Sequence, residues 1–489
     1  MPTLPDLPAD GETGGTSLGR AVERRPMSVR GLAPADLRGA RAVVMGLGRF
    51  GGGAGAALHL VRNGASVVGT DLRSAQELPE AVSALAGSGV ELVLGRHDER
   101  DFERADLVVA NPAVRPDHPL LVGARSRGAR VATEIELFVA ASHGRHVGIT
   151  GTQGKSSTTS FVAELLRAGG ARVFAGGNLG GSLLERVDDV ARDDWVVLEL
   201  SSYQLEHLGD PPAGARTFRA AAVTNVELDH LERHGGLAGY ARAKRRVLEL
   251  AADDADVWLP SGSGPTEGWT RERGAIRRFD PRASDGDVAL ADGGVLPGPS
   301  ALGLPSFQAA NLRLAYGIAH ALGVGVDDLR AAAPRLRPPS HRFERLDDLR
   351  GATVVDNGVS TTPDSTASAL LALAGPVVLL VGGRLKDLPL HPLLAAARGR
   401  VRRAFAFGES AGALASALGS TGIDAVAAGT LERAVSLAVG DLRRGDALLF
   451  SPACASFDAH ANFEDRAKAF RRTLEASRAT YEEGRAPVS

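Results

Sequence analysis

A lysine and a serine, Lys155 and Ser156, follow a short turn at residues 151–154 that begins and ends with glycine. Residues 147–150, before the turn, have the apolar character of a buried strand, and the residues after it continue as a helix. Such a turn places backbone N–H groups at a helix N-terminus, where the helix dipole favours phosphate. Lys155 can reach β- and γ-phosphate oxygens, and the Ser156 hydroxyl can bind Mg²⁺. The turn therefore predicts a nucleoside triphosphate site.

The spacing of this turn differs from that of the usual phosphate-binding loop. Only Thr152 and Gln153 separate Gly151 from Gly154, whereas the usual loop has four residues between its glycines. The general pattern is therefore not met, and an ordinary strand-to-helix turn is the alternative. The choice between the two depends on the rest of the chain.

Three further polar side chains are candidates for chemistry. Glu199 interrupts an apolar run at residues 195–204, and a carboxylate is costly to bury there unless it is paired or bound to a metal. The alternative for Glu199 is an exposed strand end. A strand at residues 221–225 leads to His230, and Lys244 follows fourteen residues later on a predicted helix. A single His or Lys is usually structural, so these two need support from other motifs.

A second glycine pattern lies near the start of the chain. Gly46, Gly48 and Gly51 follow an apolar strand with the spacing Gly-x-Gly-x-x-Gly, and Asp71 lies twenty residues beyond Gly51 at the end of a second strand. Dinucleotide-binding units place a ribose-binding carboxylate at this distance. The pattern alone indicates a nucleotide-like ligand, for which an NAD-dependent oxidoreductase is the first interpretation.

The composition limits the class of protein. At 489 residues the chain is long enough for about three domains. Its net charge of −2 argues against nucleic acid as a partner, since a nucleic-acid surface carries a basic excess. The single cysteine, Cys454, excludes a disulfide framework, and we expect it to be a buried apolar residue in a cytoplasmic protein. No segment has the apolar length of a secretory signal or a membrane span, so we expect no membrane partner.

Strand and helix patterns alternate along most of the chain, which predicts an α/β fold with mostly parallel sheets. We expect a disordered tail at residues 1–37, because that segment is rich in Pro, Gly, Asp and Thr. We place three domains at residues 38–143, 144–340 and 341–489. Residues 253–299 are rich in Gly, Pro and Asp, and we expect irregular strands and loops there.

Five groups of residues, in this order, resemble the Mur ligases, which are ATP-dependent amino-acid-adding enzymes of peptidoglycan precursor synthesis. The resemblance covers roughly residues 40–475. The groups are residues 151–157, 198–206, 224–230 together with Lys244, 341–344, and 451–458 together with 462–464. The run Ser-Pro-Ala-Cys-Ala-Ser, which begins at Ser451, is the most specific and points to the glutamate-adding branch of the family.

The resemblance implies a fold and a reaction. It implies a Rossmann-like N-terminal domain that binds a UDP-sugar in place of a dinucleotide, a central P-loop-type ATPase domain, and a Rossmann-like C-terminal domain that binds glutamate. The reaction would be the addition of D-glutamate to UDP-N-acetylmuramoyl-L-alanine through an acyl phosphate. It would use ATP and two Mg²⁺ ions in a cytoplasmic monomer.

The resemblance also assigns residues to each ligand. The catalytic residues would be Lys155, Glu199, His230 and Lys244. ATP would contact Gly151, Thr152, Gln153, Gly154, Lys155, Ser156, Ser157, Asn311 and Arg342. One Mg²⁺ would be held by Ser156 and Glu199, and a second by His230 and Lys244, the latter carbamylated so that it offers anionic oxygens. The UDP-sugar would contact Gly46, Gly48, Gly51, Asp71 and Asn178, and glutamate would contact Thr361, Lys386, Ser456, Phe457 and Phe463.

Several positions depart from the family pattern. Gln153 replaces an asparagine of the phosphate loop, Phe307 and Gln308 replace a His-Asn pair, and Val359 replaces a lysine that usually faces the active site. In the first domain, residues 111–113 read Asn-Pro-Ala where Ser-Pro-Gly is usual. These departures bear on nucleotide contacts and substrate detail.

Three alternatives stay open. A ligase similar to folylpolyglutamate synthetase would share the central phosphate loop, but it generally lacks the leading glycine-patterned domain. A non-catalytic nucleotide-sugar-binding relative would not need Lys155, Glu199, His230 and Lys244. A branch of the family adds L-glutamate, and the loss of a lysine at Val359 leaves that choice open. The sequence identifies no general base.

Overall fold

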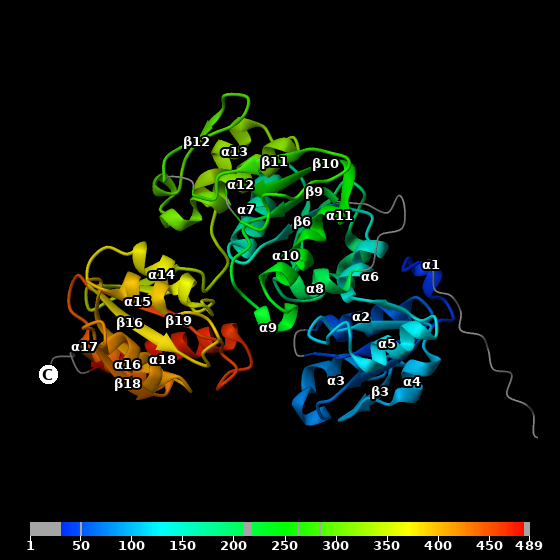
Figure 1. The fold of residues 1–489 in the computed structure, drawn as a ribbon, viewed down its shortest axis with the longest axis horizontal. Helices are drawn as coiled ribbons and strands as arrows, with labels where there is room; N and C mark the ends of the chain where they lie inside the picture. The colour runs from blue at the N-terminus through cyan, green and yellow to red at the C-terminus, as the bar shows by residue number, and fades with distance from the viewer. Residues whose placement is uncertain (1–30, 49–50, 209–217, 263, 283–284, 484–489) are drawn as a thin grey trace, which may run out of the picture.

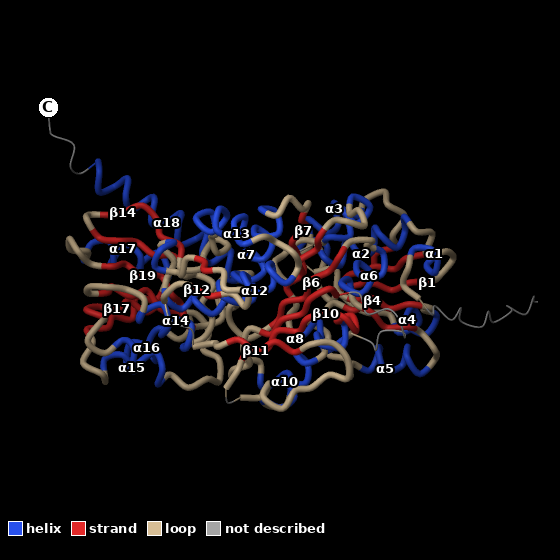
Figure 2. The backbone as a smooth tube through the Cα atoms, turned by 90° about the horizontal axis from the view of Figure 1, so that it is seen from above, coloured by secondary structure: helices blue, strands red, loops and turns tan. Residues whose placement is uncertain are grey.

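The computed structural model of the protein describes residues 31–48, 51–208, 218–262, 264–282 and 285–483. Three units, each built on one main sheet, follow one another along the chain, and the central unit lies between the other two (Figure 1). Helices lie on both sides of the strands in the view from above (Figure 2). The architecture is the three-domain α/β fold with mostly parallel sheets that the alternating patterns predict.

The N-terminal sheet has five parallel strands in the order β3-β2-β1-β4-β5. The strands are β1 (Arg41–Met45), β2 (Ser66–Asp71), β3 (Glu91–Leu94), β4 (Leu107–Ala110) and β5 (Arg130–Ala132). The helices are α1 (Pro34–Leu37), α2 (Gly52–Arg62), α3 (Pro79–Leu85), α4 (Glu99–Arg104), α5 (Pro119–Ser126) and α6 (Glu134–Ala141), with a 3₁₀ turn η1 (Ala75–Glu77). The strand order reverses between β1 and β4, where open α/β sheets place ligands.

The predicted disordered tail is wrong at its C-terminal end. Residues 34–37 form α1, and Leu32 and Leu37 are 4% and 0% exposed within the core of the N-terminal unit. Two leucines in a Gly- and Pro-rich stretch supply the apolar contacts that fix it, because burial of a leucine outweighs the ordering cost of its residue. Residues 1–30 of the predicted tail lie outside the described residues.

The central sheet has six parallel strands in the order β11-β10-β9-β6-β8-β7. The strands are β6 (Arg145–Thr150), β7 (Val173–Gly177), β8 (Trp195–Glu199), β9 (Phe218–Val223), β10 (Ala251–Pro260) and β11 (Ile276–Phe279); β12 (Val288–Ala289) and β13 (Val295–Leu296) form a separate hairpin. The helices are α7 (Lys155–Ala168), α8 (Ser202–His207), α9 (Leu231–His234), α10 (Leu237–Arg245), α11 (Val247–Leu250), α12 (Ala309–Ala321) and α13 (Val326–Ala332). Short 3₁₀ turns are η2 (Leu183–Asp189), η3 (Ser300–Leu302), η4 (Ser306–Gln308) and η5 (Ala333–Arg335).

Residues 253–299 form strands and loops, as expected, and the strand β10 is irregular because its register against β9 shifts between Ala251 and Asp256. This ten-residue strand lies between β9 and β11 and is parallel to both. Val257 and Leu259 are fully buried, so packing overrides the weak local signal of Asp- and Gly-rich sequence.

The C-terminal sheet has six strands in the order β14-β15-β19-β16-β17-β18, of which only β14 is antiparallel to its neighbour. The strands are β14 (Glu344–Leu349), β15 (Ala352–Asp356), β16 (Val377–Gly382), β17 (Val401–Phe407), β18 (Asp424–Gly429) and β19 (Ala447–Ala453). The helices are α14 (Pro363–Leu371), α15 (His391–Ala397), α16 (Ala411–Gly419), α17 (Leu431–Asp441) and α18 (Phe463–Glu483). Cys454 is buried, as expected, and burial raises the pKa of its thiol to about 12.

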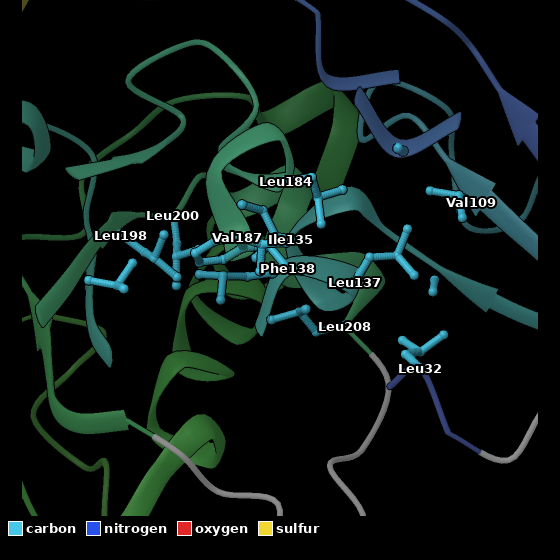
Figure 3. Packing of buried hydrophobic residues seen from close by; sticks show 14 of the residues in the cluster. Leu32, Val109, Ile135, Leu137, Phe138, Leu184, Val187, Leu198, Leu200 and Leu208 are labelled. Carbon is cyan, nitrogen blue, oxygen red and sulfur yellow. The ribbon is translucent and has the colours of Figure 1, made fainter. Parts of the chain in front are cut away.

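The N-terminal and central units share one hydrophobic core. Ile135 and Phe138 of α6 pack with Leu184 and Val187 of η2, and the same cluster continues to Leu198 of β8 (Figure 3). The two main clusters of the C-terminal unit contain only residues from that unit. The first two units are therefore joined by apolar packing in a way that the third is not. Within the described residues, no helix has the length and apolarity that crossing a membrane requires.

Candidate active site

The phosphate-type turn lies between β6 and α7 and is held by the end of β9. The side-chain oxygen Oδ1 of Asn225 accepts hydrogen bonds from the N–H groups of Thr152 (3.0 Å) and Gln153 (2.8 Å). The Thr224 hydroxyl donates to the carbonyl of Gln153 at 2.5 Å. These two amides are thus already bonded within the protein, which leaves the later turn of the loop for phosphate. Asn225 was not among the predicted site residues.

Glycine is required at both ends of this turn. Gly151 has φ +150° and Gly154 has φ +78°, and a Cβ at either position would collide with a side chain, Thr224 at the first and Asn311 at the second. Asn311 therefore packs directly beneath the loop. Its amide donates to Gln308 (2.8 Å), and Gln308 donates to Ser157 (3.2 Å). The predicted nucleotide contact of Asn311 stays a prediction, and the structure gives it a supporting position.

Lys155 is enclosed at the start of α7. Its ammonium donates to the Thr152 carbonyl at 2.9 Å, so the side chain curls back over the loop. Burial lowers the pKa of Lys155, while the negative charges of Glu199 and Asp229 act in the opposite direction. The amine lies where a phosphate would restore its charge balance.

Glu199 ends β8 and is 1% exposed. Its Oε1 accepts a hydrogen bond from the Asn178 side chain at 2.7 Å, whereas Oε2 is buried and has no partner among the described residues. A buried carboxylate oxygen without a donor is costly unless a cation binds it. This observation fits the magnesium ligand that the resemblance implies, and it places Asn178 against that ligand.

His230 adopts a left-handed conformation, with φ 49°, at the start of α9. Its Nδ1 lies 3.2 Å from the Tyr203 hydroxyl and its Nε2 lies 3.3 Å from Asp229. Burial lowers the pKa of His230 to about 4; the Asp229 charge opposes the shift, whereas nearby lysines, Lys155 and Lys244 among them, add to it. A neutral imidazole is the form that can bind a metal.

Lys244 projects from α10 and is 1% exposed. Its amine donates to the Gly151 carbonyl at 2.7 Å and lies 4.4 Å from the centre of the Tyr240 ring. Burial lowers the pKa of this amine well below its ordinary value, and the positive charge of Lys155 adds to the effect. The two lysines therefore converge on the same loop from different helices.

The glycine pattern near the start of the chain, Gly46, Gly48 and Gly51, forms the N-terminal part of the site. Gly51 caps α2 in a left-handed conformation, and Gly46 lies so close to Asn111 that a Cβ would be 2.7 Å from the Asn111 Cβ. Burial would raise the pKa of Asp71, but hydrogen bonds from Arg73 and from the Gly48 N–H outweigh it and lower the pKa. Asp71 thus supports the glycine loop as a charged carboxylate.

The C-terminal unit brings a lysine to Asp229 of the central unit. The Lys386 ammonium contacts Asp229 at 3.1 Å and the Thr361 hydroxyl at 3.5 Å. Arg342 is half-buried; burial lowers the pKa of its guanidinium, whereas the charges of Glu199 and Glu464 act in the opposite direction. Its Nε has no partner among the described residues, and its guanidinium lies 6.0 Å from the Phe463 ring centre.

A cavity of about 770 Å³ opens where the three units meet. Of the predicted site residues, it is lined by Gly46, Gly48, Lys155, Asn178, His230, Lys244, Phe457 and Phe463. Three more predicted residues, Ser156, Glu199 and Ser456, are buried and are not among the residues that line the cavity. The side chain of Phe457 is 68% exposed. Sequence reasoning did not assign Asp229, Tyr203 or Tyr240, which also line the cavity and lie near the motif residues that were assigned.

Arg466 organises the segment that carries Ser456. Its buried guanidinium donates to five backbone carbonyls, those of Gly358, Ser360, Gly382, Cys454 and Ala455. One side chain thus fixes the ends of β15, β16 and β19. The terminal helix also carries Arg471, Arg472 and Arg478, so the sequence does not single out Arg466.

A cluster of one histidine and two carboxylates lies in the C-terminal unit. His341, Glu344 and Asp356 converge closely enough to bind a metal ion. Arg471 already bonds to Asp356 at 2.7 Å and to Glu344 at 2.5 Å, and His341 contacts Asp356 at 2.7 Å. The cluster is therefore an ion-pair network that ties α18 to β14 and β15.

Three parallel-sheet units around a shared cavity, with a phosphate-type turn at its wall, define a nucleotide-dependent α/β enzyme. The chain matches the family models described as Mur ligase MurD-like N-terminal domain (residues 40–133), Mur ligase middle domain (149–259), and Mur ligase glutamate ligase domain (341–454). The chain belongs to the Mur ligase family. It is accordingly an ATP-dependent ligase that forms amide bonds.

Curated relatives cover nearly all of the chain. It is 32% identical to the UDP-N-acetylmuramoylalanine--D-glutamate ligase of Acidobacterium capsulatum, over 91% of this chain and 98% of that one. Identity to the ligase of the same name from Anaeromyxobacter dehalogenans is 37%, over 90% and 98%. Among solved structures, the fold is similar to UDP-N-acetylmuramate-alanine ligase of Thermotoga maritima, with TM-score 0.57 and 19% identity over 90% and 100% of the chains. It is also similar to MurF ligase of the same organism in complex with ADP, with TM-score 0.55 and 16% identity over 92% and 97%.

Proposed function

We propose that this ligase adds D-glutamate to UDP-N-acetylmuramoyl-L-alanine at the expense of ATP. The observation that carries the proposal is the shared cavity, which is lined by the first glycine loop, by Lys155 of the phosphate loop and by Phe463 of the glutamate-binding unit. Relatives that carry the name of this activity align with at least 89% of the chain. Each of the three substrates thus has a candidate site on a different unit.

The reaction follows from this arrangement. The terminal carboxylate of the nucleotide sugar attacks the γ-phosphorus of ATP, and ADP leaves with the electrons of the broken P–O bond. The glutamate amine, in its neutral form, then attacks the acyl phosphate, and inorganic phosphate leaves from the tetrahedral intermediate. Lys155 lies at the loop where negative charge moves between γ-phosphate and carboxylate, and it would stabilise that charge.

Magnesium fits the side chains that this site offers as ligands. Glu199 and Ser156 would hold one ion, as the unpartnered Oε2 of Glu199 indicates, and His230 with a carbamylated Lys244 would hold a second. When bound, these ions would neutralise phosphate charge. Asn178 would keep Glu199 oriented, and Tyr203 and Asp229 would orient the His230 ring.

The C-terminal unit supplies the contacts proposed for glutamate. Lys386 and Thr361 lie within reach of each other, so a carboxylate of the amino acid can bond to both. Ser456, Phe457 and Phe463 would complete that site. Val359 leaves one wall without the usual lysine, which is the feature that keeps L-glutamate as the second candidate.

Phosphate release with a panel of amino acids and UDP-N-acetylmuramoyl-peptides tests the proposal. We expect turnover only with UDP-N-acetylmuramoyl-L-alanine and glutamate, and kcat/KM higher for D- than for L-glutamate. A clear preference for L-glutamate would move the protein to the other branch. Absence of turnover with every pair would instead support a non-catalytic relative.

We further propose a cytoplasmic monomer without nucleic-acid or membrane partners.

A further inference from the structure

The side chain of Gln153 reaches from the phosphate loop to the C-terminal unit. Its amide nitrogen Nε2 lies 3.3 Å from the Thr362 hydroxyl, 209 residues further along the chain. Thr362 is the N-cap of α14, and its hydroxyl also accepts the N–H of Ser365 at 3.4 Å. Gln153 is not among the residues that line the shared cavity, so this amide points toward the neighbouring unit.

Both ends of this contact belong to well-anchored structure. The main chain of Gln153 is fixed on one side by Asn225 and on the other by Thr224. Thr362 is 3% exposed, and one turn later Thr366 bonds to the hydroxyls of Ser360 (2.7 Å) and Ser451 (2.9 Å). Movement at one end of the link is therefore passed to a fixed element at the other.

Charged groups of both signs also face each other across the two units. Lys386 attracts Asp229 across the interface. Glu227 of the central unit faces Asp364 of α14: burial raises the pKa of Glu227, and the like charge of Asp364 adds to the rise. Attraction and repulsion thus oppose each other, and the neutral hydrogen bond of Gln153 adds an attraction that protonation does not remove.

The length of the side chain decides whether this bond forms. The family's asparagine is shorter by one methylene, or about 1.5 Å. An amide withdrawn by that distance from a contact of 3.3 Å lies outside hydrogen-bond range. The glutamine that departs from the family pattern is therefore the residue type that spans the gap.

We propose that Gln153 is a positioning residue that couples closure of the glutamate-binding unit to the phosphate loop. The inference rests on the proposed function, because it assigns glutamate to the unit that Thr362 belongs to. When α14 lies against the loop, Gln153 holds the two in register, which places the incoming amine beside the acyl phosphate. The link affects the third substrate and would take the place of the ATP contact expected of Gln153, because its N–H, its carbonyl and its side-chain amide are all hydrogen-bonded within the protein.

Two substitutions of Gln153 and two of Thr362 test the link. Gln153→Asn shortens the amide, Gln153→Met keeps the length without a donor, Thr362→Ala removes the acceptor, and Thr362→Ser keeps it. In phosphate-release assays we expect the first three to raise the KM for glutamate about two- to tenfold, with the KM for ATP within about twofold of wild type. Thr362→Ser should match wild type. Gln153→Met combined with Thr362→Ala should cost no more than either change alone.

Small-angle X-ray scattering with ADP supplies a readout independent of turnover. We expect a larger radius of gyration for Gln153→Met than for wild type. Thermal unfolding serves as a separate control, because it shows whether Thr362→Ala has only weakened the N-cap of α14. An unchanged KM for glutamate and unchanged scattering would overturn the proposal, as would a rise confined to the KM for ATP. If wild type releases no phosphate with any amino acid, the proposed function fails, while the scattering comparison still decides the link.

Discussion

Lys244 carries its amine into a setting where an ammonium ion is poorly stabilised. The side chain is 1% exposed, bonds to the Gly151 carbonyl and has Lys155 as a neighbouring positive charge. A neutral amine can react with CO₂ to form a carbamate and release a proton. The carbamate would bring negative charge to the loop beside Lys155 and His230.

We predict that Lys244→Ala is nearly inactive and is partly rescued by a short-chain carboxylic acid. The acid would occupy the volume of the lost side chain and replace the carbamate oxygens. Phosphate release with and without added acetate or propionate measures this, and Lys468→Ala, which removes an exposed lysine of α18, serves as the control. A structure obtained with bicarbonate that shows an unmodified amine would contradict the prediction.

Glu134 makes the stability of the protein depend on pH. It begins α6, accepts a hydrogen bond from Ser182 at 2.7 Å and faces the shared cavity. Burial raises the pKa of Glu134 to about 7, and the Ser182 bond only partly opposes this. The folded-state pKa is thus above the unfolded value of 4.5, so folding favours the protonated form. That contribution is complete below about pH 4.5 and is lost as the pH rises toward 7.

We therefore predict that Glu134→Gln stabilises the protein at pH 8 and has little effect at pH 4.5. Glutamine retains an acceptor for Ser182 and carries no charge. The gain at pH 8 should be about 1–3 kcal/mol, since the effect of raising the pKa of Glu134 from 4.5 to about 7 is reduced by the opening to the cavity. Urea unfolding at both pH values measures it. Equal effects at the two pH values would show that folding does not raise the pKa of Glu134.

At the scale of elements, α8 and α9 clamp the N-terminal unit onto the central one. Arg233 of α9 donates to the carbonyls of Pro112, Ala113 and Val114, and it also pairs with Glu206 of α8. His207 of α8 donates to the carbonyl of Val114 at 2.7 Å. The loop after β4, which bears the departure at Asn111, is thereby fixed from the central unit.

We predict that Arg233→Ala raises the KM for the nucleotide sugar about three- to tenfold with a smaller effect on kcat. The loop beside the first glycine pattern would lose three charge-assisted bonds, while the apolar core would keep the two units together. Arg219→Ala, which removes an exposed arginine of β9, is the matched control. The proposal of a clamp fails if both variants bind the nucleotide sugar equally well in calorimetry.

Some features of the structure could be predicted from local sequence patterns, and others could not. The turn at residues 151–154, the Glu199 strand and the Gly46 loop are encoded in short stretches, and each occurs where its local pattern predicts. Other contacts join residues that are far apart in the sequence: the partner of both Asn225 and Thr362 is Gln153, 72 and 209 residues away. Arg466 instead bonds to several backbone carbonyls at once. No local pattern identifies such partners. The error at Leu32 has the same origin, because tertiary burial overrode local composition.

At the scale of the whole molecule, the three units are joined in two different ways. The first two share a continuous apolar core through α6 and η2 (Figure 3). The C-terminal unit meets the central one through Lys386–Asp229, Gln153–Thr362 and an edge-to-face contact of Phe307 with Phe343 at 5.3 Å. Polar contacts of this kind exchange readily with water, so this interface resembles one that opens and closes.

We predict that calorimetry of the free protein resolves two unfolding transitions. The N-terminal and central units should melt together, because exposing one side of their common core exposes the other, and the C-terminal unit should melt separately. Leu184→Ala should lower the first transition, at a cost of about 2–5 kcal/mol, and leave the second in place, whereas Leu379→Ala in the C-terminal core should do the reverse. ADP together with the nucleotide sugar should raise the first transition more than the second. A single transition that both substitutions lower equally would show that the third unit folds as one with the other two.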